Sequence, residues 1–189
     1  AVVPGTGPCG CVGVVYEAPD PRDLFAELVL FRELLHQHGY GAEICAPADL
    51  VRQDKRLWLN GTAVDFVYNR LTDFSFEHVM NEPLRSAYLS GEVAVSPHPR
   101  AHAIYADKRN LSLLGNQDFL RTTGIPESSI NLLLTAVPKT DLVTLDNRDT
   151  LRAKRRQLFF KPAAGYGSKA SYRGDKLTRR VWEEIGRGT

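Results

Sequence analysis

The chain has 189 residues, of which 43% are apolar and 24% charged, the balance of a globular protein with one domain or two small ones. This composition excludes an intrinsically disordered chain, a coiled coil and a collagen-like repeat. No stretch approaches the ~18 consecutive apolar residues of a membrane-spanning helix, and the start lacks the pattern of a secretory signal. We therefore expect a cytoplasmic protein with reduced cysteines and no membrane partner.

The charge is unevenly distributed along the chain. Residues 1–138 hold 11 Lys and Arg against 16 Asp and Glu, whereas residues 139–189 hold 13 against 6. A basic final quarter is typical of a segment that meets a polyanion, either a nucleic acid or the phosphates of a nucleotide. Alternatively, these basic residues form only the solvent-exposed face of a helix and bind no polyanion.

The first hundred residues show the pattern of an α/β domain. Cys11–Tyr16 and Ala42–Ala46 are short apolar runs typical of strands, and the amphipathic stretch between them predicts a helix that ends at Gly39. Strand, helix and strand in this order predict a parallel pair. Asn60-Gly61 predicts a tight hairpin turn between strands Arg56–Leu59 and Thr62–Tyr68. We expect a mainly parallel sheet here, followed by helix Pro83–Leu89 and strand Val93–Ser96.

The second part, residues 101–189, predicts a smaller α+β domain after a connector that contains Pro97 and Pro99. The glycine turn Gly165–Gly167 lies between two of its expected strands. The other expected elements are helices Asp107–Leu114, Gln117–Thr123, Asp149–Gln157 and Leu177–Ile185, and strands Ile130–Val137, Leu158–Pro162 and Ala170–Tyr172.

Several motifs do not carry the chemistry that they suggest. Gly5–Gly10 matches G-x-G-x-x-G, but it precedes the first strand instead of joining a strand to a helix, so it does not predict a dinucleotide site. His36 and His38, or His98 and His102, do not predict a metal site, because neither pair has a third ligand near in sequence. No serine-nucleophile motif is present.

The segment Phe160–Lys169 is the most informative motif. An apolar strand delivers Lys161, and the glycine turn follows directly. Glycines let backbone N–H groups approach phosphate oxygens, and a lysine adds a fixed positive charge. A plain β-hairpin turn on a basic surface is the alternative.

The order of motifs resembles the ATP-grasp superfamily of carboxylate ligases, which includes glutathione synthetase, glutathionylspermidine synthase and D-alanine–D-alanine ligase. Asp107-Lys108 opens a helix, Gly124-Ile125-Pro126 follows, and a Lys-Pro strand precedes the glycine-rich loop. Val64–Asp73 resembles the strand end beside the substrate cleft of glutathione-synthetase-like members. The resemblance implies a Rossmann-like pre-ATP-grasp domain over residues 1–100 and the first nucleotide-binding lobe over residues 101–189.

The resemblance also implies a function, an ATP-dependent ligation of a small carboxylate to an amine or thiol. Asn69 and Arg70 become candidates for substrate contact, although a surface salt bridge is an equal alternative for Arg70. Magnesium ligands are expected outside this chain, which looks like an N-terminal portion without turnover of its own, and no catalytic residue is assigned. The residues expected to bind ATP are Lys108, Lys161, Gly165, Gly167, Ser168 and Lys169.

A second hypothesis comes from another class of protein. The basic final quarter could make the chain a non-catalytic nucleic-acid-binding module, although nucleic acid is not an expected partner of a ligase. A purely structural α/β domain is a third possibility. The residues that would grip a phosphate backbone are Arg152, Lys154, Arg155 and Arg156, with Tyr166 and Tyr172 near them in sequence.

Overall fold

A computed structural model of the chain describes residues 10–17, 25–167 and 169–186. The chain forms two compact units that meet in sequence between Ala103 and Ile104, three residues beyond the boundary expected after residue 100. Each unit is described by itself. Within the described ranges, no helix combines the length and the apolar character needed to cross a membrane.

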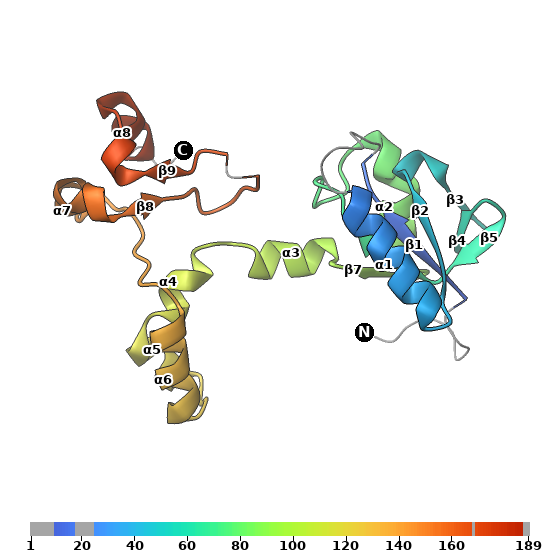
Figure 1. Ribbon diagram of the computed structural model, residues 1–189, viewed down its shortest axis with the longest axis horizontal. Coiled ribbons are helices and arrows are strands. Elements are labelled where there is room, and N and C mark those ends of the chain that lie inside the picture. The colour runs from blue at the N-terminus through green and yellow to red at the C-terminus, as the bar shows by residue number, and fades with distance from the viewer. Residues whose placement is uncertain (1–9, 18–24, 168, 187–189) are drawn as a thin grey trace. The chain divides into compact units, whose positions relative to one another are not determined.

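The first unit is built on a four-stranded parallel sheet (Figure 1). Its strands are β1 (Cys11–Val15), β2 (Gly41–Cys45), β6 (Phe66–Asn69) and β7 (Ala94–Ser96), in the spatial order β2-β1-β6-β7. The β1–β2, β1–β6 and β6–β7 pairs are all parallel. The predicted α/β class and the parallel pairing of the first two strands are confirmed.

Two helices cover opposite faces of this sheet. Helix α1 (Phe25–Gln37) packs against β2, and its Phe31 ring stacks on Tyr68 of β6 with centroids 4.5 Å apart. Helix α2 (Glu82–Leu89) belongs to the core cluster that contains Val67. Because neighbouring residues of a strand point to opposite faces, Tyr68 and Val67 place α1 and α2 on opposite sides.

An antiparallel sheet lies beside the parallel one. It consists of β3 (Leu50–Gln53), β4 (Arg56–Leu59) and β5 (Thr62–Val64), paired in that order. Asn60 and Gly61 both have positive φ, 49° and 79°, as the predicted tight turn requires.

The predicted strand Thr62–Tyr68 is wrong as a single element, because the chain leaves one sheet and enters the other at Asp65. The Asp65 N–H donates to the Cys11 carbonyl, and the Asp65 carbonyl accepts from Ala94 N–H, both at 3.1 Å. These bonds join Asp65 to strands of the parallel sheet, so β5 ends at Val64 and β6 begins at Phe66.

The core of the first unit fills the space between the α2 face of the parallel sheet and the antiparallel sheet. Its largest fully buried side chains include Phe76, Leu57, Leu59 and Leu84. The complete cluster is Val15, Cys45, Leu50, Leu57, Leu59, Val64, Val67, Leu71, Phe76, Leu84, Ala87, Val93 and Val95.

The second unit consists of short helices and one small hairpin (Figure 1). Strands β8 (Phe159–Phe160) and β9 (Tyr172–Arg173) pair antiparallel, and buried Phe160 packs edge-on against buried Trp182 with ring centroids 5.5 Å apart. The helices are α4 (Asn110–Leu114), α5 (Gln117–Thr122), α6 (Glu127–Ala136), α7 (Arg148–Lys154) and α8 (Arg179–Ile185).

Single 3-10 turns are η1 (Pro47–Asp49) and η2 (Val79–Asn81) in the first unit, and η3 (Arg155–Gln157) and η4 (Gly174–Lys176) in the second.

Two elements differ from the sequence expectation. The predicted strand Ile130–Val137 is wrong, because residues 130–136 belong to helix α6, which begins after Pro126 and carries Glu127 in its first turn. Leucine is a good helix former, and an acidic first turn favours a helix start. The expected connector at Pro97 and Pro99 contains helix α3 (Pro99–Tyr105), since a proline is tolerated in the first turn of a helix.

Candidate functional site

The Asp-Lys segment and the glycine turn of the second unit lie against each other. The backbone N–H of Lys108 donates to the Ala163 carbonyl at 2.9 Å. The Lys108 Nζ donates to the Gly165 carbonyl at 3.0 Å, across 57 positions of sequence. Two of the residues predicted to bind nucleotide, Lys108 and Gly165, are therefore in direct contact.

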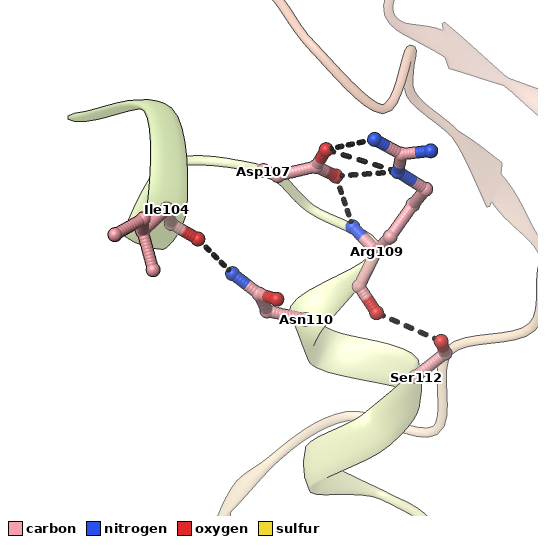
Figure 2. Close-up of polar contacts among 5 residues, drawn as sticks. All are labelled: Ile104, Asp107, Arg109, Asn110 and Ser112. Atoms are coloured by element: carbon pink, nitrogen blue, oxygen red, sulfur yellow. Dashed lines mark hydrogen bonds and ion pairs between the residues drawn. The ribbon is translucent and has the colours of Figure 1, made fainter. Parts of the chain in front are cut away.

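Hydrogen bonds of Asp107, Arg109 and Asn110 stabilise the start of helix α4, next to Lys108 in sequence (Figure 2). The Asp107 carboxylate accepts from the backbone N–H of Arg109 at 2.8 Å and from the Arg109 guanidinium. These hydrogen bonds keep the pKa of the Asp107 carboxyl below its ordinary value. The Asn110 side chain donates to the Ile104 carbonyl at 2.8 Å. Asp107 thus fixes the backbone around Lys108, and its carboxylate is already paired.

The turn itself depends on glycine. Gly165 has a φ of 127° and Gly167 a φ of 63°. Residues other than glycine adopt these backbone conformations only at a cost in free energy. Both glycines are exposed, and the Gly165 carbonyl is occupied by Lys108. The turn offers the close backbone approach that a phosphate oxygen needs.

The other predicted lysines lie over aromatic rings. The Lys161 Nζ is 5.5 Å from the centroid of the Phe159 ring, and the Lys169 Nζ is 5.0 Å from that of Tyr166. Each is a cation–π contact that restrains an exposed side chain. Ser168 lies outside the described residues.

The residues around the turn suit an anion better than a cation. In the ranges that the structure describes, no three His, Cys, Asp or Glu side chains gather where they could hold a metal ion. The nearby carboxylate, Asp107, is occupied by Arg109. No magnesium-dependent step is assigned to the described residues here.

In the first unit, Asn69 lies at the carboxyl end of β6 and is only 4% exposed. Its Nδ2 donates to the Pro97 carbonyl at 3.0 Å, and its Oδ1 accepts from Leu71 N–H at 3.0 Å. Both ends of the amide are therefore used inside the protein. The structure gives Asn69 an architectural role at the position where a substrate contact was predicted.

Arg70 is half-buried beside Asn69. Its guanidinium forms an ion pair with Glu27 of α1 at 3.0 Å and lies 6.0 Å from the centroid of the Tyr68 ring. The salt bridge that the sequence left open as an alternative is present. The Nε of Arg70 is buried and has no hydrogen-bond partner within the described residues.

Three polar residues at this edge were missed by sequence analysis. The Glu17 carboxylate, just after β1, accepts hydrogen bonds from Thr72 N–H and Asp73 N–H, both at 3.1 Å, and from the Thr72 hydroxyl at 2.6 Å. Ligands of open α/β sheets bind where neighbouring strands send their connections in opposite directions. In this sheet that point lies between β1 and β6. Polar residues directly after both strands were the available signal.

Asp73 is held by its own loop. Burial raises the pKa of its carboxyl, but hydrogen bonds from the backbone N–H groups of His78 and Glu77 and from the Asn81 amide outweigh burial and keep the pKa below its ordinary value. The His78 N–H and Asn81 Nδ2 lie 2.8 and 2.6 Å from Oδ2. Asp73 therefore stays ionised and closes the loop that follows β6.

A hollow of about 580 Å³ opens at the opposite edge of this sheet, where β1 and β2 begin. Its lining includes Arg32, Glu33 and His36 of α1. The His36 ring is already hydrogen-bonded to the backbone of Ala42 at 3.0 Å. The hollow does not coincide with the predicted substrate edge at Asn69 and Arg70.

The remaining histidines of the sequence motifs have structural partners. His98 Nδ1 accepts from Ala101 N–H at 3.1 Å, at the start of α3. The His102 ring stacks on Phe74 with centroids 3.7 Å apart. The first nine residues, which hold most of the G-x-G-x-x-G motif, lie outside the described ranges.

No protein-family model matches this chain, and no curated protein matches it either.

Proposed function

We propose that the second unit binds the phosphates of ATP, and that the chain is the N-terminal part of a cytoplasmic ATP-dependent carboxylate–amine or carboxylate–thiol ligase. The observation that supports this proposal best is the contact between Lys108 and the glycine turn, because it unites the two motifs on which the ATP-grasp resemblance rests. The Rossmann-like pre-ATP-grasp domain and the first ATP-grasp lobe are the architecture that this proposal assigns to the two units.

The chemistry suits the residues present. A triphosphate needs positive charges and backbone N–H groups, and the turn supplies exposed glycines with Lys108 at its side. Phosphoryl transfer depends mainly on positioning and charge neutralisation. The proposed site binds ATP when Lys108 exchanges the Gly165 carbonyl for a phosphate oxygen, with Lys161 and Lys169 as further cations.

The complete reaction follows from the class of enzyme. A substrate carboxylate oxygen attacks the γ-phosphorus of ATP, and ADP leaves. The amine or thiol then attacks the acyl carbon, and inorganic phosphate leaves. Arg70 is the candidate that orients the carboxylate, because arginine binds carboxylates in a bidentate manner; in this structure its guanidinium is paired with Glu27, which the substrate would have to replace. Asn69 would act indirectly, by fixing the end of β6.

The test is a calorimetric titration of the chain with ATP, compared with the variant Lys108→Met. We expect binding by the natural sequence and a roughly ten- to hundredfold weaker affinity for the variant, the size of one lost charge-assisted hydrogen bond. Lys139→Met is the matched control, because Lys139 is an exposed lysine of the same unit and lies far from the turn in sequence. Equal affinities of the two variants, or no binding by the natural sequence, would contradict the proposal.

A further inference from the structure

The turn formed by α7 and η3 carries three exposed cations, Arg152, Lys154 and Arg156. Of the acidic side chains that the structure describes, none forms an ion pair with any of the three. Arg152 and Lys154 belong to α7, and Arg156 belongs to η3, which follows directly. The protein thus keeps uncompensated positive charge on this turn.

The cations of the neighbouring helix α8 behave differently. Arg179 pairs with Glu183 at 3.0 Å, and Arg180 pairs with Glu184 at 3.1 Å. Both pairs have the i,i+4 spacing that stabilises a helix. The basic character of the final quarter is therefore divided into compensated charge on α8 and uncompensated charge on α7 and η3.

The basic turn is firmly attached to the β8–β9 hairpin. Gly174, buried in η4, leaves no room for a Cβ, because a methyl group there would overlap the Arg155 carbonyl oxygen. The Gly174 N–H donates to the Leu158 carbonyl, and the Leu158 N–H donates to the Arg155 carbonyl, both at 2.9 Å. These backbone contacts hold the cations at a fixed place beside the hairpin.

An exposed aromatic ring follows the cations directly. Phe159 of β8 is 56% exposed, whereas the next residue, Phe160, is buried against Trp182. Since strand residues alternate between faces, Phe159 lies on the outer face of the hairpin. More than half of the Phe159 side chain is exposed although the Lys161 ammonium lies 5.5 Å from the centroid of its ring.

We propose that Arg152, Lys154, Arg156 and Phe159 form a basic face that binds single-stranded nucleic acid without sequence preference. The cations neutralise backbone phosphates, and a base stacks on the Phe159 ring, which is the combination that sequence-tolerant single-strand binding requires. An ATP molecule alone does not need this face, which lies outside the set of residues proposed to bind nucleotide. Phe159 contacts Lys161 of that set, so competition with ATP is needed to separate the two proposals.

The test uses fluorescence anisotropy with a labelled oligothymidylate of about 20 nucleotides, a length that covers one or two sites of typical size. The natural sequence should bind, with a salt dependence that corresponds to about three phosphate contacts, a slope near −2 on logarithmic axes. The variant with Arg152→Gln and Arg156→Gln should bind at least about tenfold more weakly and should show a flatter slope.

The matched control removes two cations that are already compensated, through Arg179→Gln and Arg180→Gln. This control should bind within about twofold of the natural sequence, because its charges are engaged on α8. Phe159→Leu should weaken binding about tenfold through the lost stacking, with the salt slope unchanged. Circular dichroism spectra of all variants identify any variant that fails to fold. If the variant with Arg152→Gln and Arg156→Gln does not fold, Arg152→Gln alone, a smaller change on the exposed side of α7, takes its place.

Three results would overturn the proposal. The two double variants could weaken binding equally, which would show an effect of net charge alone. Excess ATP could displace the oligonucleotide, which would place both ligands at one site. Vesicles of phosphatidylserine could bind while the oligonucleotide does not, which would identify the basic face as a membrane contact instead.

Discussion

Lys108 and Gly165 are joined by a hydrogen bond of 3.0 Å from the lysine ammonium to the glycine carbonyl. A carbonyl oxygen is a weaker partner for an ammonium group than an ionised oxygen is. The contact therefore holds the turn while leaving the lysine able to exchange its partner for a phosphate. The dynamics of the turn should depend on this one side chain.

The first prediction concerns Lys108→Met in the ligand-free protein. Loss of the ammonium contact should lower the backbone order of Gly165 and Gly167 on the picosecond to nanosecond timescale, because few other side chains anchor the turn. The ¹⁵N heteronuclear NOE of the two glycines measures this change. Lys161→Met should leave both values unaltered, because Lys161 lies over the Phe159 ring. A turn equally ordered in both variants would contradict the role of Lys108.

A second prediction concerns the network that fastens β3 to the end of α2. The Arg52 guanidinium donates to both Glu92 oxygens at 2.6 and 2.7 Å, and to the hydroxyls of Ser86 and Ser90 at 3.2 and 3.3 Å. Arg52→Met should lower the midpoint of thermal unfolding. Arg56→Met, an exposed arginine of the same sheet, should lower it less.

The same network should make stability depend on pH. Its hydrogen bonds hold the pKa of Glu92 below the ordinary value of 4.5. A carboxyl with a depressed pKa in the folded state contributes stability above its unfolded pKa, and loses it as pH falls through the folded pKa. The difference in unfolding midpoint between the natural sequence and Arg52→Met should therefore shrink below pH 4.5. A difference that is constant with pH would show that Glu92 does not contribute.

The third prediction concerns Trp182, which is 2% exposed. Its Nε1 is buried without a hydrogen-bond partner among the described residues. Trp182→Ala should cost about 3–5 kcal/mol of unfolding free energy. Trp182→Phe should cost less than about 1.5 kcal/mol, because removal of the unpaired N–H offsets part of the lost packing. Urea unfolding measures both, and equal costs would contradict the role of the unpaired group.

The fourth prediction concerns the thiol of Cys45. Burial, followed by the charges of Asp49, Cys11 and Glu43, raises its pKa to about 12. At pH 8 its thiolate population should fall roughly a thousandfold below that of a free cysteine. Iodoacetamide should leave Cys45 unmodified in the folded protein and modify it in urea, as mass spectrometry of its peptide would show. Rapid modification in the folded protein would contradict this burial.

Local patterns predicted much of the first unit. The Val-rich run at β1, the amphipathic α1 and the Asn60-Gly61 turn each depend on interactions between neighbouring residues, and each element is present. The break at Asp65 was beyond such patterns, because it depends on hydrogen bonds to Cys11 and Ala94, which are distant in sequence. Strand membership is decided by partners that periodicity does not reveal.

In the second unit, local sequence patterns predicted less of the structure. The leucine-rich run from residue 130 fits a strand or a helix equally well by periodicity, and Pro126 with Glu127 supplied the helix start that was overlooked. The resemblance assigned Lys108 and the glycine turn to one nucleotide site, but neither it nor any local rule predicted their direct contact. For Arg70, the pairing with Glu27 depends on the packing of α1 beside β6, which the sequence does not display.

Gly174 has a consequence for any sequence alignment over this unit. Lysines and arginines on a surface exchange freely during divergence, so the basic residues are poor markers for an alignment. A backbone position that excludes every side chain cannot drift in this way. Any homologue that keeps the hairpin must keep glycine opposite the Arg155 carbonyl. The register of a distant alignment over this unit is best fixed at that residue.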